Sequence, residues 1–587
     1  MVERVLEHPA KAHNPVEEEG RLARLSHKEW RVAPRIPQET SNRLAPFSPL
    51  AAQLLHNRGI TELSQAEAFL SRDESRLEDP LLLPDMERAI ARIHRALLEH
   101  EAIGIFGDFD TDGITGTALL AEGLTTLGAR VIPYIPHRVE EGHGLNSRAI
   151  SALHQQGITL LITVDCGVTS KAEVEEASSL GMDTIITDHH VPPAQPPRAW
   201  AIVNPSLASS SYPFPHLAGV GLAFKLVQGL CHHMGLPWDR RLLQMAALGT
   251  VTDMAPLVGE NRYIVAAGLR SLSIEPRPGL KELLRLGGME GDGVDTESIS
   301  FILGPRLNAP GRLEHAMTSY NLLRAPSLEE AQPLAQELER MNRERQELTQ
   351  RALEKARQQL GPGGPSDPLI LLCSEEFTPG IVGLVASRLV EEHYRPAVVV
   401  ALDGHQGRGS ARSIPEFNLA SALTECQDLF VRFGGHPRAA GFIIPKQRLP
   451  ALRERLLDIA RRELSHLPLE PTIRVDAHVR LASLPGANLQ FLHDLAPYGE
   501  ENPTPVFLTR GVEVIDTRRL GAQGQHLRLK LKHGGAVWDA MAFGQGEAWQ
   551  EKARLLDVVY SVGVDRWSGA ESFRLVIEDF RPVEGPG

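Results

Sequence analysis

The sequence is poor in cysteine and contains no long apolar run. Four cysteines occur among 587 residues without forming a C-x-x-C pair: Cys166, Cys231, Cys373 and Cys426. This scatter argues against a disulfide framework or a structural zinc and favours a reducing cytoplasm. No apolar stretch approaches the roughly 20 residues of a membrane helix, and residues 1–8 do not form a secretory signal. We therefore expect a cytoplasmic protein without a membrane segment.

An excess of positive charge is also missing. The chain has 61 basic and 74 acidic residues and a formal net charge of −13. Taken alone, this argues mildly against a nucleic-acid partner. However, acidic metal ligands count as negative in this sum, although a bound cation reverses the local sign. Whether the chain binds nucleic acid therefore has to be judged from the distribution of the basic residues rather than from their total.

The chain is too long for one hydrophobic core, so we expect about two to four domains. Its hydrophobic content of 42% and charged content of 23% are ordinary for a soluble globular protein. The local patterns predict a loosely ordered arm (1–45), an α/β domain (46–326), a connecting helix (327–360), a smaller α/β domain (361–468) and a β domain (469–587).

Within the first domain, short apolar runs alternate with helical stretches. This alternation predicts a doubly wound parallel sheet. The runs are Ala102–Phe106, Val131–Ile135, Leu160–Val164, Thr184–Thr187 and Ala201–Val203. A mainly helical section follows, from Gly219 to about Leu323.

The later parts carry different signals. Ser327 is a suitable N-cap for a long charged helix that ends at Leu360. The strand-like runs Leu369–Leu372 and Ala397–Leu402 open the smaller α/β domain. After Pro471, about five short strands in about a hundred residues suit a small barrel of the OB type.

Acidic residues and histidines cluster where apolar segments end. They are Asp108, Asp110, Asp112, Asp165, Asp188, His189, His190 and Asp253. The carboxyl ends of parallel strands converge on one edge of a sheet, where ligands bind. Carboxylates and imidazoles gathered at such an edge would repel one another unless cations held them. Mixed Asp and His ligands in this number suit two divalent metals.

An isolated acidic loop or His-His pair would carry little weight, because such residues often only cap helices or bind calcium. His232-His233 illustrates this, since it lies in the helical run Val227–Met234 with no carboxylate nearby in sequence. We interpret that pair as part of a half-exposed helix face. Asp188-His189-His190 differs because it is expected at a strand end, with three further acidic strand ends in register with it.

The order of these motifs resembles a known family. Asp108-Phe109-Asp110-Thr111-Asp112-Gly113, Asp165, Asp188-His189-His190 and Asp253 are similar to the four motifs of the DHH phosphoesterase superfamily, and within it to the single-strand-specific 5′→3′ DNA exonucleases. The segments Leu217–Gly221, Gly304–Arg312 and Gly434–Gly441 resemble further signatures of that branch. The resemblance runs from about Ala66 to the C-terminus. It implies a DHH catalytic domain, a DHHA1-type nucleic-acid-binding domain and an OB-fold domain.

The resemblance also implies roles at the strand ends. Metal ligands would be Asp110, Asp112, Asp165 as the bridging ligand, His189 and Asp253, with Asp108 as a ligand or a neighbour that supports one. His190 would face the scissile phosphate, and Asp188 would orient the two histidines. Cys166 is expected to be a packed thiol, because no base motif accompanies it.

Phosphate contacts are implied in the smaller α/β domain. Gly409-Ser410-Ala411-Arg412-Ser413 resembles the family's phosphate-contacting loop: its small residues let backbone N–H groups approach an anion, and Arg412 can bind two phosphate oxygens. The alternative is an ordinary polar turn. His436 is expected to reach into the cleft between the two α/β domains. Thr378 stands where the family commonly has His, so the contact of that imidazole is in doubt here.

Further basic residues are candidates for DNA contacts in the first domain. Arg306, Asn308 and Arg312 are predicted in a loop bounded by glycine and proline that could follow the DNA backbone. The alternative is a set of surface charges paired with neighbouring acids. Arg138, just after Val131–Ile135, lies at the active edge and is a candidate for binding the 5′ end.

One strand of the β domain gives a signal that does not depend on resemblance. Basic residues alternate with leucines from His526 to Lys532. A period of two places Arg528, Lys530 and Lys532 on one face with His526, and the leucines on the core face. Nearby strands carry Trp538, Phe543 and Trp567. Phosphate neutralisation beside aromatic rings suits single-stranded nucleic acid, although a solvated exterior with core aromatics is the alternative.

Together, the resemblance implies a metal-dependent exonuclease that degrades single-stranded DNA 5′→3′ to 5′-mononucleotides in recombination and repair. It implies two Mn²⁺ or Mg²⁺ ions as cofactors, and a single-strand-binding protein and a helicase as partners. We expect a monomer whose cleft admits one strand and excludes a duplex.

Two alternatives stay open. A DHH phosphoesterase acting on short oligonucleotides or cyclic dinucleotides is one, but a small substrate requires neither the barrel nor so long a chain. A catalytically silent scaffold is the other, but a scaffold has no need to keep mutually repelling acids together.

Overall fold

The computed structural model describes residues 28–289, 293–521, 523–546, 549, 554–565 and 572–583. Contacts divide these residues into two compact units. Unit 1 contains Glu67–Arg345 and Leu495–Pro503, and unit 2 contains the remaining described residues. Within the described chain, no helix is both long and apolar enough to cross a membrane.

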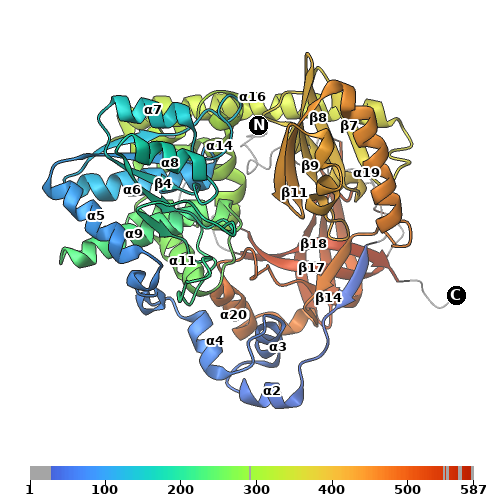
Figure 1. Ribbon diagram of the computed structural model, residues 1–587. Coiled ribbons are helices and arrows are strands. Elements are labelled where there is room, and N and C mark those ends of the chain that lie inside the picture. The colour runs from blue at the N-terminus through green and yellow to red at the C-terminus, as the bar shows by residue number, and fades with distance from the viewer. Residues whose placement is uncertain are drawn as a thin grey trace, which may run out of the picture. The chain divides into compact units, whose positions relative to one another are not determined.

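Unit 1 is built on a parallel sheet of five strands in the order β3-β2-β4-β5-β6. Figure 1 labels its central strand, β4. The strands are β2 Ala102–Gly107, β3 Arg130–Tyr134, β4 Leu160–Val164, β5 Asp183–Thr187 and β6 Ala201–Val203. The predicted apolar runs therefore coincide with strands to within one residue at each end. The last residues of β2, β4 and β5 are aligned with one another in the register.

Helices cover both faces of this sheet, which confirms the doubly wound architecture. Alternate strand residues face opposite ways: Ile105 and Ile162 join one core cluster with α6, α9 and α10, whereas Phe106 and Leu161 join another with α7 and α8. The helices of unit 1 are α5 Met86–Leu98, α6 Thr111–Thr126, α7 Ser147–Gln155, α8 Lys171–Ser179, α9 Gly219–His233, α10 Leu242–Thr252, α11 Gly259–Ile274, α12 Pro278–Leu286, α13 Thr296–Ser298, α14 Gly304–Leu313 and α15 Met317–Arg324.

A buried ion pair joins α9 to α11. The ammonium of Lys225 contacts the carboxylate of Glu260, and both side chains are almost fully buried. Lys225 also donates to the carbonyl of Glu78 at 2.6 Å, and the Tyr212 hydroxyl donates to Glu260. Burial lowers the pKa of Lys225, and the nearby carboxylate opposes that shift. Each buried charge thus depends on its partner.

Lys225→Met should therefore reduce the free energy of unfolding by about 3–5 kcal/mol, because Glu260 stays buried without its cation. Urea unfolding followed by circular dichroism measures the loss. Arg340→Met is the matched control, since Arg340 is half-exposed among glutamates, where such pairs contribute about 0–1 kcal/mol. Similar losses in both variants would contradict the importance of the buried pair.

The chain returns to unit 1 with Leu495–Pro503. The guanidinium of Arg262 donates to the carbonyl oxygens of the first three residues of this segment and lies over the ring of Phe69 at 4.2 Å. The backbone N–H of Leu257 donates to the carbonyl of Glu500 at 2.8 Å. The segment thereby fixes the loop that follows α10.

The long helix α16 Leu328–Leu360 connects the units. The Ser327 hydroxyl accepts the N–H of Glu330 at 3.3 Å, which confirms the predicted N-cap. The helix ends before Gly361, whose φ of +73° suits a glycine after a helix.

Unit 2 contains a five-stranded sheet in the order β10-β11-β9-β8-β7. Its elements are β7 Ile370–Ser374, α17 Val382–His393, β8 Ala397–Asp403, β9 Gln406–Arg412, α18 Leu419–Thr424, β10 Arg432–His436, β11 Ala439–Pro445 and α19 Leu449–Leu464. The predicted loop at 409–413 is wrong for all but Ser413, because β9 pairs on both sides, with β8 and β11.

The C-terminal part of unit 2 is the predicted β-barrel. Its strands pair in the order β14-β15-β16-β18-β17, and β14 also pairs with β17, which closes the ring. The elements are β12 Thr472–Val475, β13 Ala477–His478, α20 Ala487–Leu495, β14 Phe507–Leu520, β15 His526–His533, β16 Ala536–Ala542, β17 Leu555–Asp565 and β18 Ser572–Pro582.

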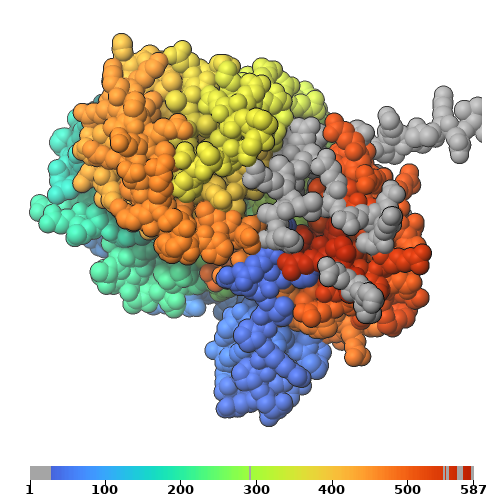
Figure 2. Space-filling view, turned by 90° about the vertical axis from the view of Figure 1, so that its right-hand side faces the viewer, coloured from blue at the N-terminus to red at the C-terminus, as the bar shows by residue number. Residues whose placement is uncertain are grey.

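Part of the predicted loose arm is ordered. β1 Glu29–Val32 pairs in parallel with β12, and the helices α2 Gln38–Arg43, α3 Pro49–Asn57 and α4 Leu63–Leu70 follow. The Trp30 indole donates to Asp579 at 2.7 Å, and the Arg581 guanidinium lies 3.9 Å from the centroid of its ring. Figure 2 shows this N-terminal segment against the C-terminal strands. Contacts with residues distant in the sequence hold this segment in place, and no local sequence pattern predicts these contacts.

Candidate metal centre

Three strand ends bring the acidic residues together. Because β2, β4 and β5 end in register, Asp108, Asp165 and Asp188 leave the sheet side by side. Asp253 caps α10. Its Oδ2 lies 3.9 Å from Nδ1 of His189, so the end of α10 reaches the same edge.

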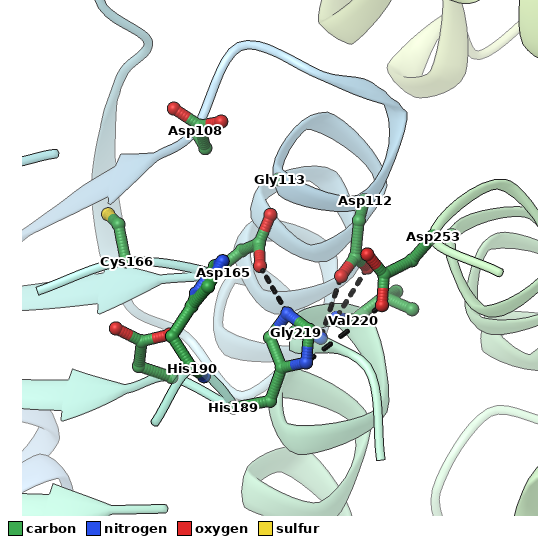
Figure 3. Close-up of polar contacts among 12 residues, drawn as sticks. Asp108, Asp112, Gly113, Asp165, Cys166, His189, His190, Gly219, Val220 and Asp253 are labelled. Carbon is green, nitrogen blue, oxygen red and sulfur yellow. Dashed lines mark hydrogen bonds and ion pairs between the residues drawn. The ribbon is translucent and has the colours of Figure 1, made fainter. Parts of the chain in front are cut away.

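The loop after β2 carries two further carboxylates into α6. Asp110 is the N-cap of α6 and accepts the N–H of Gly113 at 3.1 Å. Asp112 accepts the N–H groups of Gly219 and Val220, at the start of α9, at 2.7 and 2.8 Å (Figure 3). Helix N-termini favour negative charge. The backbone therefore fixes both carboxylates.

Two glycines allow this close approach. A Cβ at Gly219 would lie 2.5 Å from Cβ of Asp165, and a Cβ at Gly249 would lie 2.7 Å from Oδ1 of Asp112. Neither distance is tolerated by real atoms, so any larger residue would displace a carboxylate. This explains physically why the signature Leu217–Gly221 contains a glycine at position 219.

Asp165 has an unusual backbone conformation. Its φ is +62°, in the left-handed region that costs most residues free energy but that Asp and Asn adopt more readily. Its Oδ1 and the Oδ1 of Asp108 are buried and accept no hydrogen bond within the described residues. Nε2 of His189 lies 3.1 Å from Asp165 Oδ1, a separation suited to two ligands of one cation. These features match a site built to receive metal.

The side chains form three overlapping groups, and the ligand atoms within each group lie within 4.8 Å of one another. The groups are Asp108, Asp110 and Asp165; Asp112, His189 and Asp253; and Asp165, His189 and His190. Asp165 and His189 each belong to two of them. The arrangement thus offers two adjacent cation positions with Asp165 between them.

Burial raises the pKa of four of these carboxylates. Burial raises the pKa of Asp110 and Asp112 to about 6. At Asp110 the negative charge of neighbouring aspartates adds to this shift, whereas at Asp112 the N–H groups of Val220 and Gly219 oppose it. Burial and the same neighbours raise the pKa of Asp253 to about 9 and that of Asp165 well above its usual range. The repulsion expected from the sequence is therefore present, and divalent cations would relieve it.

Asp188 positions His190. Its Oδ1 lies 2.7 Å from His190 Nδ1 and also accepts the backbone N–H of His190, while Oδ2 accepts the N–H of Val168 at 2.9 Å. The hydrogen bond to Asp188 raises the pKa of His190 to about 9. Since Nδ1 faces Asp188, Nε2 is the nitrogen that can meet a substrate.

The Cys166 thiol is buried beside Asp165 (Figure 3). Burial raises its pKa well above the usual range. A protonated, buried thiol is a poor nucleophile, which agrees with the expected packing role.

Arg138 lies at the active edge, as the sequence indicated. Its guanidinium lies 4.7 Å from the centroid of the Phe109 ring, and Asp108 and Asp110 interact with it electrostatically. His143, which sequence reasoning missed, contacts the same loop: its Nδ1 lies 3.3 Å from Asp108 Oδ2, and its ring lies 4.3 Å from that of Phe109. The glycines on both sides of His143 were its only local signal.

The prediction of a loop at Gly304–Arg312 is wrong, because these residues form α14. Arg306 is 6% exposed, and its Nε donates to Glu339 at 2.7 Å. It pairs with an acid, as in the alternative, but as a buried rather than a surface charge. Asn308 accepts the N–H of Thr111 at 3.1 Å. Arg312 is half-buried near the C-terminal end of the helix.

In unit 2, Ser410 and Arg412 share one face of β9. Arg412 Nη1 donates to Ser410 Oγ at 3.1 Å. A Cβ at Gly383, in the first turn of α17, would lie 3.1 Å from both side chains. An arginine and a hydroxyl thus stand at a helix N-terminus, where anions bind favourably. His436, at the end of β10, is exposed.

The basic face of the barrel is confirmed on β15 but is less positive than predicted. Arg528, Lys530 and Lys532 are exposed and alternate with buried leucines. Arg528 lies 3.4 Å from Asp539, and Lys532 lies 3.2 Å from Glu513. Acids on the neighbouring strands therefore offset part of the charge.

The aromatic part of that prediction needs correction. The Trp538 indole is buried and donates to the carbonyl of Leu481 at 3.3 Å. His526 is also buried, and its Nδ1 accepts the N–H of Gly544 at 3.0 Å. Neither side chain is therefore free to stack on a base. Trp567 lies outside the described residues.

The chain matches three family descriptions. Residues 102–250 match the N-terminal domain of the DHH family, residues 367–462 match the DHHA1 domain, and residues 475–579 match the RecJ OB domain. Together they span the parallel sheet, the smaller mixed sheet and the barrel.

Curated proteins and solved structures are also similar. Single-stranded-DNA-specific exonuclease RecJ of Bacillus subtilis is 37% identical over 537 residues, which are 91% of this chain and 68% of that protein. RecJ of Escherichia coli is 31% identical over 579 residues, 94% of this chain and 98% of that protein. Crystal structures of RecJ from Thermus thermophilus with Mn²⁺ and with Mg²⁺ have TM-scores of 0.80 and 0.75, at 32% and 31% identity. Both matches cover 95% of this chain, and 80% and 79% of those chains.

Proposed function

The chain belongs to the RecJ family of single-stranded-DNA-specific exonucleases, and we propose that it degrades single-stranded DNA 5′→3′ to 5′-mononucleotides at the candidate metal centre. The observation that carries the proposal is the pair of adjacent ligand groups joined through Asp165 and His189 at the sheet edge.

We infer two divalent cations, Mn²⁺ or Mg²⁺, at this edge. Carboxylate oxygens, which make up most of the candidate ligands, suit both metals. One cation would be held by Asp108, Asp110 and Asp165, and the other by Asp112, His189 and Asp253. Because Asp165 Oδ1 lies 3.1 Å from Nε2 of His189, Asp165 is our candidate for the ligand that bridges the two cations. Such cations lower the pKa of a water molecule and neutralise the charge that grows on the phosphate.

Two cationic or polar groups would position the substrate at this edge. His190, held through Nδ1 by Asp188, presents Nε2 toward a scissile phosphate. Arg138, half-buried against Phe109, is our candidate for binding the 5′ end. Both would act by orientation, which keeps the phosphodiester in line for attack.

Unit 2 would bind the rest of the strand. Ser410 and Arg412 would hold a backbone phosphate beside the first turn of α17, and His436 would contact the strand nearby. Arg528, Lys530 and Lys532 would attract the phosphates further along the strand. In unit 1, Arg312 stays a predicted contact with the DNA backbone. A single-strand-binding protein and a helicase are the partners that family membership suggests.

Arg412→Gln should raise the KM for single-stranded DNA about tenfold, because it removes one charge-assisted hydrogen bond. The salt dependence of KM should become shallower, since fewer counterions are released. Steady-state kinetics at several salt concentrations measure both. Arg455→Gln is the control, because Arg455 is exposed and pairs with Asp428. An unchanged KM in Arg412→Gln would remove Arg412 from the DNA path.

Oligonucleotides labelled at the 5′ or the 3′ end test the proposed function. With Mn²⁺, labelled mononucleotide should appear at once from the 5′-labelled single strand and only late from the 3′-labelled one. EDTA or a matching blunt duplex should prevent release. Early release from the 3′ end would contradict the polarity. Cleavage restricted to very short oligonucleotides would favour a small-substrate phosphoesterase, and binding without cleavage would favour a scaffold.

A further inference from the structure

Helix α14 packs against the metal centre at two places. A Cβ at Gly304 would lie 2.8 Å from Cγ2 of Thr252, and a Cβ at Gly311 would lie 2.9 Å from the carbonyl oxygen of Phe109. Thr252 and Phe109 are each adjacent in sequence to a candidate ligand. Helix α14 therefore contacts both the C-terminal end of α10 and the loop after β2 that carries Asp108 and Asp110.

Asn308 makes the most direct contact. Its Oδ1 accepts the backbone N–H of Thr111, which stands between Asp110 and Asp112. Thr111 is the first residue of α6, and the first N–H groups of a helix have no intrahelical partner. Asn308 therefore satisfies one of these groups and fixes the start of α6 against α14.

The position of α14 is itself fixed by buried polar contacts. Arg306 pairs with Glu339 of α16 at 2.7 Å and donates to the carbonyl of Ile302 at 2.9 Å. The Ser319 hydroxyl donates to the carbonyl of Leu307 at 2.7 Å. Because such contacts are costly to break when buried, α14 is a rigid support.

We propose that α14 is a brace for the metal centre and that Asn308 is a positioning residue for Asp110 and Asp112, rather than a DNA contact. The proposal rests on the metal centre inferred above. Ligand sets function only when their supporting contacts hold them within about 0.5 Å of the productive geometry. Without the Asn308 carboxamide, the first turn of α6 and both carboxylates lose that support.

Two substitutions at Asn308 separate positioning from DNA contact. Asn308→Ala should weaken Mn²⁺ binding about 10–100-fold, as expected for loss of an outer-shell partner. It should lower kcat and leave the KM for DNA unchanged. Asn308→Asp keeps an acceptor oxygen in place and should bind Mn²⁺ nearly as well as the wild type. Isothermal titration with Mn²⁺, without DNA, and steady-state kinetics measure these effects.

If Asn308 instead contacted a phosphate, the order of the variants would reverse. Asn308→Asp would then be worse than Asn308→Ala, with a raised KM, because a carboxylate repels phosphate. That outcome would overturn the proposal.

A substitution on the donor side gives an independent check. Thr111→Pro removes the N–H that Asn308 accepts. Proline is favoured at the first helical position, and the φ of −88° and ψ of 179° at Asp110 suit a residue before proline. Thr111→Pro should match Asn308→Ala, and the double variant should show no further loss. Additive losses would mean that the two groups act independently, against the proposal.

Controls separate this proposal from the proposed function. Glu314→Gln, at the exposed end of α14, should bind Mn²⁺ like the wild type, and thermal melts should show that all variants are folded. A wild type that does not bind Mn²⁺ would contradict the metal centre itself. Wild-type binding with unchanged binding by Asn308→Ala would overturn only the brace.

Discussion

Asp165→Asn should abolish Mn²⁺-dependent degradation of single-stranded DNA, with a loss larger than the roughly 100-fold upper value typical of outer-shell partners. Asp165 belongs to the group of Asp108 and Asp110 and contacts His189 of the other group, so the substitution should weaken both cation positions at once. Asparagine is the appropriate replacement because it tolerates the φ of +62° that alanine would not. Rates with saturating substrate over a range of Mn²⁺ concentrations measure the effect.

Cys166→Ala is the matched control for Asp165→Asn. Cys166 is the next residue and is buried, but its thiol has no part in the proposed chemistry. Its activity should stay close to that of the wild type. Activity retained in Asp165→Asn would refute the bridging role, whereas activity lost in both variants would attribute the effect to local misfolding.

Asp188→Asn should lower kcat about 10–100-fold while Mn²⁺ binding is largely retained. An amide cannot accept all three contacts that the Asp188 carboxylate makes with His190 and Val168. His190 then loses the partner that fixes its ring orientation and tautomer. Parallel measurements of kcat and Mn²⁺ affinity separate this orienting role from ligation.

Asp183→Asn is the control for Asp188→Asn on the same strand. Asp183 is the first residue of β5, at the opposite end of the strand from Asp188, and pairs with Arg92. Its substitution should affect stability and leave kcat unchanged. If Asp188→Asn lost Mn²⁺ binding in proportion to kcat, Asp188 would have to be counted among the residues that hold the metals.

The central sheet and most candidate ligands could be predicted because their signals are local. Leu160–Val164 and Ala201–Val203 are continuous apolar runs and form β4 and β6 with the predicted bounds. A parallel sheet brings its strand ends together whatever the intervening helices do. Asp165 and Asp188 could therefore be placed side by side from the sequence. The prediction of a strand end at Asp253 is wrong, because the apolar run before it belongs to helix α10, which Asp253 caps.

The segment Gly304–Arg312 could not be predicted from local signals. Its glycines and prolines favour a loop, yet tertiary contacts make it a helix. The glycines serve close packing against Thr252 and Phe109. The partner of Arg306 is Glu339, 33 residues further along the chain. A long-range ion pair of this kind leaves no pattern in one sequence.

The strand β9 was missed for a similar reason. Its glycines, such as Gly409, suggest a flexible loop, but a Cβ there would lie 2.1 Å from the Phe442 ring. Gly409 therefore makes room for an aromatic side chain of β11, the adjacent strand. Only the pairing of distant segments shows that this strand is interior to its sheet.

Anomalous diffraction from crystals of the full chain soaked with Mn²⁺ tests the central claim most directly. We predict two Mn²⁺ peaks at the edge where β2, β4 and β5 end, one beside Asp108 and Asp110 and the other beside Asp112 and Asp253, with Asp165 between them. A single peak at this edge, or peaks elsewhere with the edge empty, would contradict the two-cation account.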